Sequence, residues 1–279
     1  TDPEILRTNL ASVVLQCLDL KLGDPMAFPF VDPPEPQLVK DGLNQLRELD
    51  LVTPNGSLTS LGRTVARLPL DPRIGRMLLA ADDRGVFWEV SVVAAALSIQ
   101  DPRESGCDLP EIRDPQSEFV TWLNLWTLIE AERETLSQSR FRTWCQRLHL
   151  NHNRLREWRE IHRQIVLCFP NRPHGPRSDE LDRAGFHCAL LTGLAGQIGR
   201  REEHDYLGVR NRRFRVPKGA LEGKAAWVMA AELVETHRVM ARTVATIEPH
   251  WVIGAVPQLL KYSHQEPFWS KKQGRAMCY

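Results

Sequence analysis

The segment Tyr206-Leu-Gly-Val-Arg-Asn-Arg-Arg-Phe-Arg-Val-Pro217 predicts a β-hairpin in the C-terminal third of the chain. Apolar and polar residues alternate along two short arms, Tyr206–Val209 and Phe214–Val216, and a polar tip lies between them. Alternation with a period of two around a polar turn is typical of paired antiparallel strands. Four arginines fall within six residues, from Arg210 to Arg215. The segment that indicates a β fold is therefore also strongly basic.

This basic hairpin suggests contact with a nucleic acid. Arginines neutralise backbone phosphates, and aromatic rings offer surfaces on which bases stack. We predict phosphate contacts for the three tip arginines, a sugar or base-edge contact for the asparagine, and stacking for the two flanking rings. These residues are Arg210, Arg212, Arg213, Asn211, Tyr206 and Phe214. A solvated hairpin tip with an ordinary share of charge is the alternative, and the segment alone leaves both open.

The residues around the hairpin predict more strands. Trp227–Glu235 and Arg238–Ile247 are rich in β-forming residues and close enough to pair, whereas Pro249–Tyr262 is predicted to be helical. Phe268–Met277 reads as a final hairpin whose tip, Lys271 and Lys272, gives second-rank candidate contacts for a nucleic acid. Several strands with an interposed helix in residues 186–279 suit a small barrel of the OB type. We expect this barrel to be truncated, because the chain stops within its last strand.

Residues 1–66 predict a winged helix. A helix that begins at a capping-box pattern, Thr1 with Glu4, precedes a proline-rich linker and a second helix, Gln37–Asp50. Two short arms around Asn55-Gly56 then predict a hairpin. These 66 residues contain 5 Lys and Arg against 9 Asp and Glu. Because an acidic second helix does not suit insertion beside phosphates, we interpret this domain as a protein-docking element.

Residues 67–185 predict a helical bundle. Large apolar residues repeat at helical spacing along Ser117–Ser137, as expected of a bundle core. The stretch Arg140–Arg177 contains nine arginines against two glutamates. On its helical part, Arg156, Arg159 and Arg163 form a third-rank candidate face for a nucleic acid, with a solvated helix face as the alternative.

The composition and net charge of the whole chain exclude few classes of function, but charge is unevenly distributed along the sequence. The 279 residues have a formal net charge of +1, whereas residues 186–279 hold 14 Lys and Arg against 8 Asp and Glu. Six cysteines without regular spacing indicate free thiols in a reducing, cytoplasmic compartment. The best apolar run, Val86–Ile99, is interrupted by Glu89 and is too short to span a bilayer, so no membrane contact is expected.

The chain contains no recognisable catalytic motif. A phosphate-binding loop of the GxxxxGK[ST] type, a GxSxG elbow and an HExxH pair are all absent. Three glycines, Gly193, Gly196 and Gly199, have the wrong spacing for a dinucleotide turn and predict close packing or strand bends instead. A metal set drawn from Cys145, His149 and His152, completed by His162 or Cys168, matches no common zinc module. We therefore expect no catalysis, no metal and no cofactor in this chain.

Five stretches give the chain a family resemblance. They are Thr1–Leu10, Phe28–Pro34, Leu58–Gly62 together with Leu68–Arg73, Tyr206–Phe214 with Trp227–Thr236, and Glu266–Lys272. In this order they resemble the C-terminal region of DEAH-box helicases, and the later stretches are similar to bacterial HrpA-type RNA helicases. The resemblance covers essentially all 279 residues.

The resemblance implies a multidomain, mainly α fold with a C-terminal β-barrel. Its parts would be a winged helix over 1–66, a helical ratchet or helicase-associated domain over 67–185 and an OB-like fold over 186–279. Such helicases couple ATP hydrolysis in two RecA-like domains to movement along RNA. The implied partners are single-stranded RNA and those motor domains, which would hold ATP and Mg, and the chain would be a monomer without ATPase activity. The alternative is a protein-interaction scaffold that docks on the motor without touching RNA.

Overall fold

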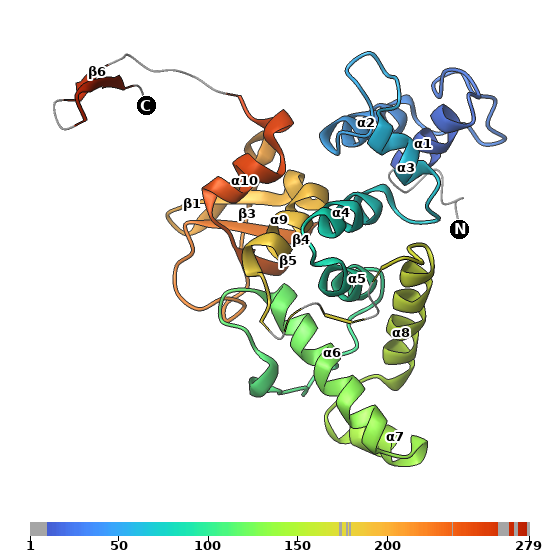
Figure 1. The fold of residues 1–279 in the computed structure, drawn as a ribbon, viewed down its shortest axis with the longest axis vertical. Coiled ribbons are helices and arrows are strands. Elements are labelled where there is room, and N and C mark those ends of the chain that lie inside the picture. The colour runs from blue at the N-terminus through green and yellow to red at the C-terminus, as the bar shows by residue number, and fades with distance from the viewer. Residues whose placement is uncertain are drawn as a thin grey trace.

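The computed structural model describes residues 10–172, 175, 176, 178, 180–235, 237–261, 268–270 and 273–277. The α-helices in these ranges, shown in Figure 1, are α1 Ala11–Asp19, α2 Pro36–Glu48, α3 Ser60–Ala66, α4 Pro72–Asp83, α5 Phe87–Ala96, α6 Glu118–Thr135, α7 Gln138–Arg147, α8 His152–Leu167, α9 Arg183–Leu194 and α10 Pro249–Ala255. The strands are β1 Ile198–Glu202, β2 Asp205–Gly208, β3 Arg213–Phe214, β4 Trp227–Glu235, β5 Val239–Thr246, β6 Phe268–Ser270 and β7 Arg275–Met277. Short 3₁₀ turns are η2 Pro110–Ile112, η3 Ala195–Gln197, η4 Val209–Asn211 and η5 Pro257–Leu259.

The N-terminal helices enclose a core of their own. Helices α1, α2 and α3 bury apolar side chains against one another, among them Leu10, Val14, Leu46 and Val65. Between α2 and α3, Val52 and Leu58 form an antiparallel bridge that closes a short hairpin. The expected order of helix, helix and hairpin is present, and α3 follows it. The interpretation as a winged helix stays a prediction, and the capping-box residues lie outside the described ranges.

Helix α5 lies at the centre of the helical part. Its side chains from Val90 to Ala96 are 0–2% exposed, because apolar residues surround the whole helix. Helices α4, α6, α8 and α9 contact it. The Trp158 ring of α8 lies 5.3 Å from the Trp122 ring and 5.0 Å from the Trp126 ring of α6. The prediction that the α6 aromatics form a bundle core is confirmed.

Helix α9 joins the helical part to the strands. The predicted boundary after residue 185 falls inside this helix, which packs along α4. A Cβ on Gly193 would lie 2.7 Å from the Arg73 carbonyl oxygen and 2.6 Å from the Met77 methyl group. Only glycine allows the two helices to come this close, so the predicted close packing at Gly193 is confirmed.

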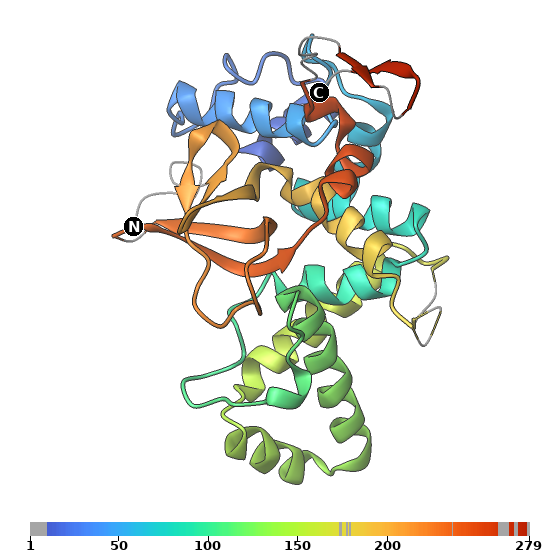
Figure 2. The same cartoon turned by 90° about the vertical axis from the view of Figure 1, so that its left-hand side faces the viewer.

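The main sheet has the order β3-β2-β1-β4-β5, and all its neighbours are antiparallel. It curls into half a barrel beside the helices (Figures 1 and 2). The predicted pairing of β4 with β5 and the final hairpin β6–β7 are both confirmed. One hydrogen bond joins the start of α6 to β5, because Glu118 accepts from the Val244 amide at 2.7 Å. The strand order and the curl of this sheet do not by themselves establish an OB fold, so the OB-like assignment stays an interpretation.

Candidate nucleic-acid interface

Strands β2 and β3 form the predicted hairpin. Tyr206 pairs with Phe214 and Leu207 pairs with Arg213 in antiparallel register. The Gly208 amide donates to the Arg212 carbonyl oxygen at 2.8 Å and closes the turn. At the tip, Arg210 and Asn211 have φ angles of 57° and 59°, a left-handed conformation that is uncommon for residues other than glycine. The hairpin itself therefore fixes the direction in which the tip points.

The two rings of the hairpin are core residues, which corrects their predicted role in base stacking. Phe214 is 1% exposed and Tyr206 is 8% exposed. The rings stack on each other with centroids 5.7 Å apart, and the Tyr206 hydroxyl donates to the Ala225 carbonyl oxygen at 3.0 Å. Both side chains point to the covered face of the sheet because they occupy directly paired positions. We therefore remove Tyr206 and Phe214 from the candidate contacts.

Each predicted phosphate-binding arginine of the tip has a carboxylate partner. The nitrogen–oxygen distances are 2.7 Å for Arg210–Glu48, 3.8 Å for Arg212–Glu235 and 2.9 Å for Arg213–Glu202. The three arginine side chains nevertheless stay 68%, 45% and 58% exposed. Ion pairs as open to water as these contribute about 0–1 kcal/mol. Because Glu202 also pairs with Arg200 at 2.9 Å, the charge of the tip is largely but not fully balanced, and the tip is only weakly committed to its present partners. Asn211 beside it is exposed.

The hairpin tip lies over a cavity of about 540 Å³ that we call the hairpin cavity. Its walls are α2, the start of α4, the turn η3, the hairpin tip and β4 (Figure 2). The charged side chains that line it are Asp41, Glu48, Asp71, Glu232, Arg73, Arg210 and Arg212. Positive and negative side chains are mixed around this cavity, so its electrostatic potential does not have one sign throughout.

A second cavity of about 800 Å³, here the bundle cavity, adjoins the first. Both are lined by Asp71, Arg73, Leu194 and Glu232. The bundle cavity extends between the end of α5, the start of α6 and the strands β4 and β5. Because these residues line both cavities, the two cavities lie side by side between the arginine tip and the junction of helices and sheet, and we refer to them together as the groove.

The bundle cavity contains polar residues that the sequence analysis missed. The Arg103 guanidinium lies 4.7 Å from the Trp122 ring centre and pairs with Asp101 at 2.7 Å. Arg154 donates to the Asp101 carbonyl oxygen at 2.8 Å. Burial raises the pKa of the Glu118 carboxyl. Because Arg103 lies in an irregular loop rich in Pro, Gly and Asp, no periodicity marks it as part of a site.

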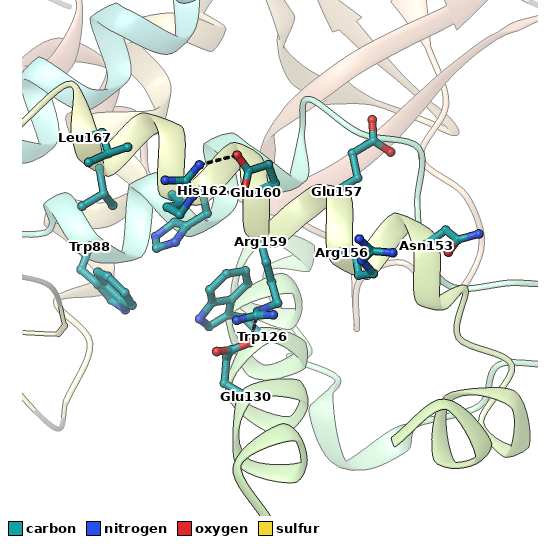
Figure 3. Close-up of a pocket in the computed structure, with 12 residues that line it drawn as sticks. Trp88, Trp126, Glu130, Asn153, Arg156, Glu157, Arg159, Glu160, His162 and Leu167 are labelled. Atoms are coloured by element: carbon teal, nitrogen blue, oxygen red, sulfur yellow. Dashed lines mark hydrogen bonds and ion pairs between the residues drawn. The ribbon is translucent and has the colours of Figure 1, made fainter. Parts of the chain in front are cut away.

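The predicted arginine face of α8 lines a different cavity, shown in Figure 3, of about 930 Å³. Arg159 pairs with Glu130 of α6 at 2.8 Å, and Arg163 pairs with Glu160 at 2.7 Å. Arg156 is exposed at the other end of the cavity. With Glu157 also on its rim, the cavity is lined by as many carboxylates as arginines.

Behind the α8 arginines lies a buried histidine. His162 is 6% exposed and contacts the rings of Trp88 and Trp126, each with centroids 4.7 Å away. Its Nε2 lies 3.0 Å from the Ser91 hydroxyl oxygen. Burial, together with the nearby Arg159 charge, lowers its pKa to about 4. The ring is therefore neutral near pH 7.

The candidate residues do not converge on one site. Figure 1 shows α8 and the sheet on opposite sides of α5, so the α8 face and the hairpin tip border different cavities. Lys271 and Lys272 lie outside the described residues. Among the residues that the structure describes, no three His, Cys, Asp or Glu side chains are grouped as metal ligands. None of the described helices is long and apolar enough to cross a membrane.

Comparison with known proteins identifies the helical part. Residues 71–151 match the family model described as helicase associated domain (HA2), ratchet-like. This range contains α4 to α7, and among them α4, α5 and α6 contribute residues to the lining of the bundle cavity. The ratchet-like domain expected from the sequence is thus present.

Proteins similar to the whole chain are RNA helicases. The chain is 40% identical to the ATP-dependent RNA helicase HrpA of Escherichia coli and 42% identical to the HrpA homolog of Haemophilus influenzae, in both cases over all of its length. It is 27% identical, over 94% of its length, to the pre-mRNA-splicing factor ATP-dependent RNA helicase prp22 of Schizosaccharomyces pombe. The chain spans 23% of the length of each of these relatives. It is similar from end to end to the C-terminal region of HrpA-type DEAH-box RNA helicases.

Proposed function

We propose that this chain is the accessory C-terminal module of an ATP-dependent RNA helicase. It binds single-stranded RNA and closes the RNA channel over two RecA-like motor domains, which hold ATP and Mg. The module itself hydrolyses no ATP. It acts as a monomer in the cytoplasm, and the N-terminal helices dock on the motor. Similarity to HrpA-type helicases along the whole chain supports this assignment.

The observation that carries RNA binding is the exposed arginine tip above the hairpin cavity. Arg210, Arg212 and Arg213 present three guanidinium groups from one short, hydrogen-bonded turn. Guanidinium groups form paired, charge-assisted hydrogen bonds with phosphate oxygens. Phosphates replace carboxylate partners at such an exposed site at little cost, because each existing pair is weak. The groove below the tip offers an extended path for a single strand.

A salt titration tests this function. The 279-residue chain is titrated into a labelled single-stranded oligouridine of about 12 nucleotides, a length within the range bound by one OB fold. We expect binding that weakens steeply between about 50 and 200 mM salt. In Arg210→Ala/Arg212→Ala/Arg213→Ala, loss of three phosphate contacts, each worth about 0.7 on single strands, reduces the magnitude of the slope of log K against log salt by about 2.

A matched triple variant controls for the loss of charge. Arg140, Arg142 and Arg147 are exposed on α7, which Figures 1 and 2 place at the end of the molecule away from α2 and the hairpin. Arg140→Ala/Arg142→Ala/Arg147→Ala should leave the slope close to that of the unaltered chain. If both triple variants bind equally, the hairpin tip is not the RNA contact.

A protein-interaction scaffold is the second candidate, and one contact favours it. The Arg210–Glu48 pair joins the hairpin to α2 across the groove, and Gln258 donates to the Glu48 carbonyl oxygen at 3.3 Å. These contacts are consistent with a purely structural role for Arg210, in which it joins the hairpin to α2 and does not contact RNA. Under this function the chain binds no oligouridine at low salt, and Arg210→Ala lowers the unfolding midpoint instead.

A further inference from the structure

The ion pair between Arg210 and Glu48 differs from the other pairs of the hairpin. Arg212, Arg213 and Arg215 pair with carboxylates of the same sheet or its turns. Glu48, in contrast, is the last residue of α2 and lies 162 positions away in sequence. The pair therefore spans the hairpin cavity, which both side chains line.

Glu48 stands where two sources of negative charge coincide. The C-terminal end of a helix carries the negative end of the helix dipole, and a glutamate there adds a further negative charge. Cations accordingly gather at this end of α2. Arg210 meets the Glu48 carboxylate at 2.7 Å, and the Nε of Arg76 donates to the Leu49 carbonyl oxygen at 3.2 Å. To a guanidinium group this spot resembles a phosphate, with oxygen acceptors and negative charge at one place.

The tip does not need Glu48 to reach its position. Its turn is closed by backbone hydrogen bonds inside the hairpin, from the Gly208 amide to the Arg212 carbonyl oxygen at 2.8 Å and from the Arg212 amide to the Val209 carbonyl oxygen at 3.3 Å. The left-handed backbone at Arg210 and Asn211 belongs to the same turn. The backbone of Arg210 thus stays beside the cavity after the carboxylate is removed, and its guanidinium group remains within reach of a strand in the cavity.

We propose that Glu48 is an internal competitor for the RNA-binding site. It occupies the Arg210 guanidinium in the absence of RNA and gives it up to a phosphodiester group of a single strand. This inference rests on the proposed RNA-binding function. The Arg210 side chain is 68% exposed and that of Glu48 is 33% exposed, so water screens the pair and the exchange is readily reversible. When the exchange occurs, the link between the hairpin and α2 opens and admits the strand to the groove.

A double-mutant cycle tests the competition with the same labelled oligouridine. Glu48→Gln keeps the size of the side chain and removes its charge. We expect it to raise RNA affinity by about two- to five-fold, since an exposed ion pair no longer has to be given up. It should also steepen the salt slope by up to about one phosphate contact. In an Arg210→Ala background the same substitution should change affinity little, because no competition remains.

Asp41→Asn is the matched control for Glu48→Gln. Asp41 lies on the same helix and lines the same cavity, but it accepts its hydrogen bond from the Gln37 side-chain amide, at 2.9 Å, on its own helix. A gain in affinity that Asp41→Asn reproduces, or that persists in the Arg210→Ala background, would reflect general electrostatics and overturn the proposal. An unchanged or reduced affinity of Glu48→Gln would overturn it as well.

The two hypotheses fail in different ways. If the unaltered chain and Glu48→Gln both bind no RNA at low salt, RNA binding itself is wrong, and the competition falls with it. If the unaltered chain binds RNA and the cycle shows no coupling, RNA binding stands and only the competition is wrong. Binding by Glu48→Gln alone would support both, since a gain of about two- to five-fold can carry a weak complex across the detection limit.

Discussion

Two buried histidines make the stability of this fold depend on pH. His162 and His187 are 6% and 2% exposed. Burial is the main cause that lowers the pKa of each to about 4, from an ordinary value of about 6.5. His187 Nδ1 lies 2.6 Å from the Arg183 carbonyl oxygen and its Nε2 lies 2.8 Å from the Ser117 hydroxyl oxygen, so both ring nitrogens are used in the neutral form. Lowering the pH therefore favours the unfolded chain, in which both rings protonate freely.

The magnitude follows from the two pKa values. The folded pKa is depressed, so the stability is fully present above about pH 6.5 and is lost as the pH falls toward about 4. At pH 5 the unfolded histidine is almost fully protonated and the folded one is almost fully neutral, which costs about 2 kcal/mol per residue at about 1.4 kcal/mol for each pKa unit. Together the two histidines remove about 4 kcal/mol between pH 7.5 and pH 5, a large part of a typical folding free energy of about 5–15 kcal/mol.

Urea unfolding followed by tryptophan fluorescence at a series of pH values measures this loss. His162→Gln and His187→Asn cannot titrate in this range, so each should reduce the loss between pH 7.5 and pH 5 by about half, whatever its effect at pH 7.5. Their combination should remove most of it, and His152, whose pKa is lowered mainly by burial, contributes to the remainder. Glu118 acts in the opposite direction, because burial raises its pKa and the folded state then holds its proton more tightly. Single variants that keep the full pH dependence of the unaltered chain would refute the assignment.

Two further predictions concern packing and buried N–H groups. Gly193→Ala should lower the free energy of unfolding by about 1–3 kcal/mol, because its Cβ would lie 2.6 Å from the Met77 methyl group. Gly254→Ala is the control and should be neutral or slightly stabilising, because its Cβ would have nothing within 4 Å. Urea midpoints compare the two, and equal midpoints would contradict the close packing of α4 and α9. Trp158→Phe should lower the free energy of unfolding by about 1–2 kcal/mol more than Trp122→Phe does. The reason is that the Trp158 N–H donates a 2.9 Å hydrogen bond, whereas the buried Trp122 N–H has no partner among the described residues. Equal losses in the two variants would show that the indole hydrogen bond is not what stabilises the fold.

The sequence predicts the elements of this fold well where periodicity is strong. The α6 aromatics repeat at helical spacing and do form the bundle core, and β4 and β5 pair as their β-rich segments indicate. The sequence is less informative at α9. The buried residues of this helix surround it, so neither a period of two nor a period of 3.6 stands out.

The candidate site was only half predictable, because the missing half depends on contacts between distant residues. The arginine tip is visible in the sequence. The burial of Tyr206 and Phe214 depends on which face of the curled sheet encloses its own small core with Val228 and Val244, and the local alternation does not contain that information. The Arg210–Glu48 pair depends on the placement of α2 against the hairpin, which no local pattern encodes.

The pairing also changes what the charge of the C-terminal third means for RNA. Residues 186–279 carry six more Lys and Arg than Asp and Glu, yet the three tip arginines face three carboxylates. One of these, Glu48, lies in the acidic N-terminal third and is invisible to a count over the C-terminal residues alone. A largely balanced tip exerts little attraction beyond the screening length of about 8–10 Å, so it does not steer RNA from a distance. Its binding energy must come from exchange of partners at contact, and salt should therefore change the dissociation rate of RNA more than its association rate.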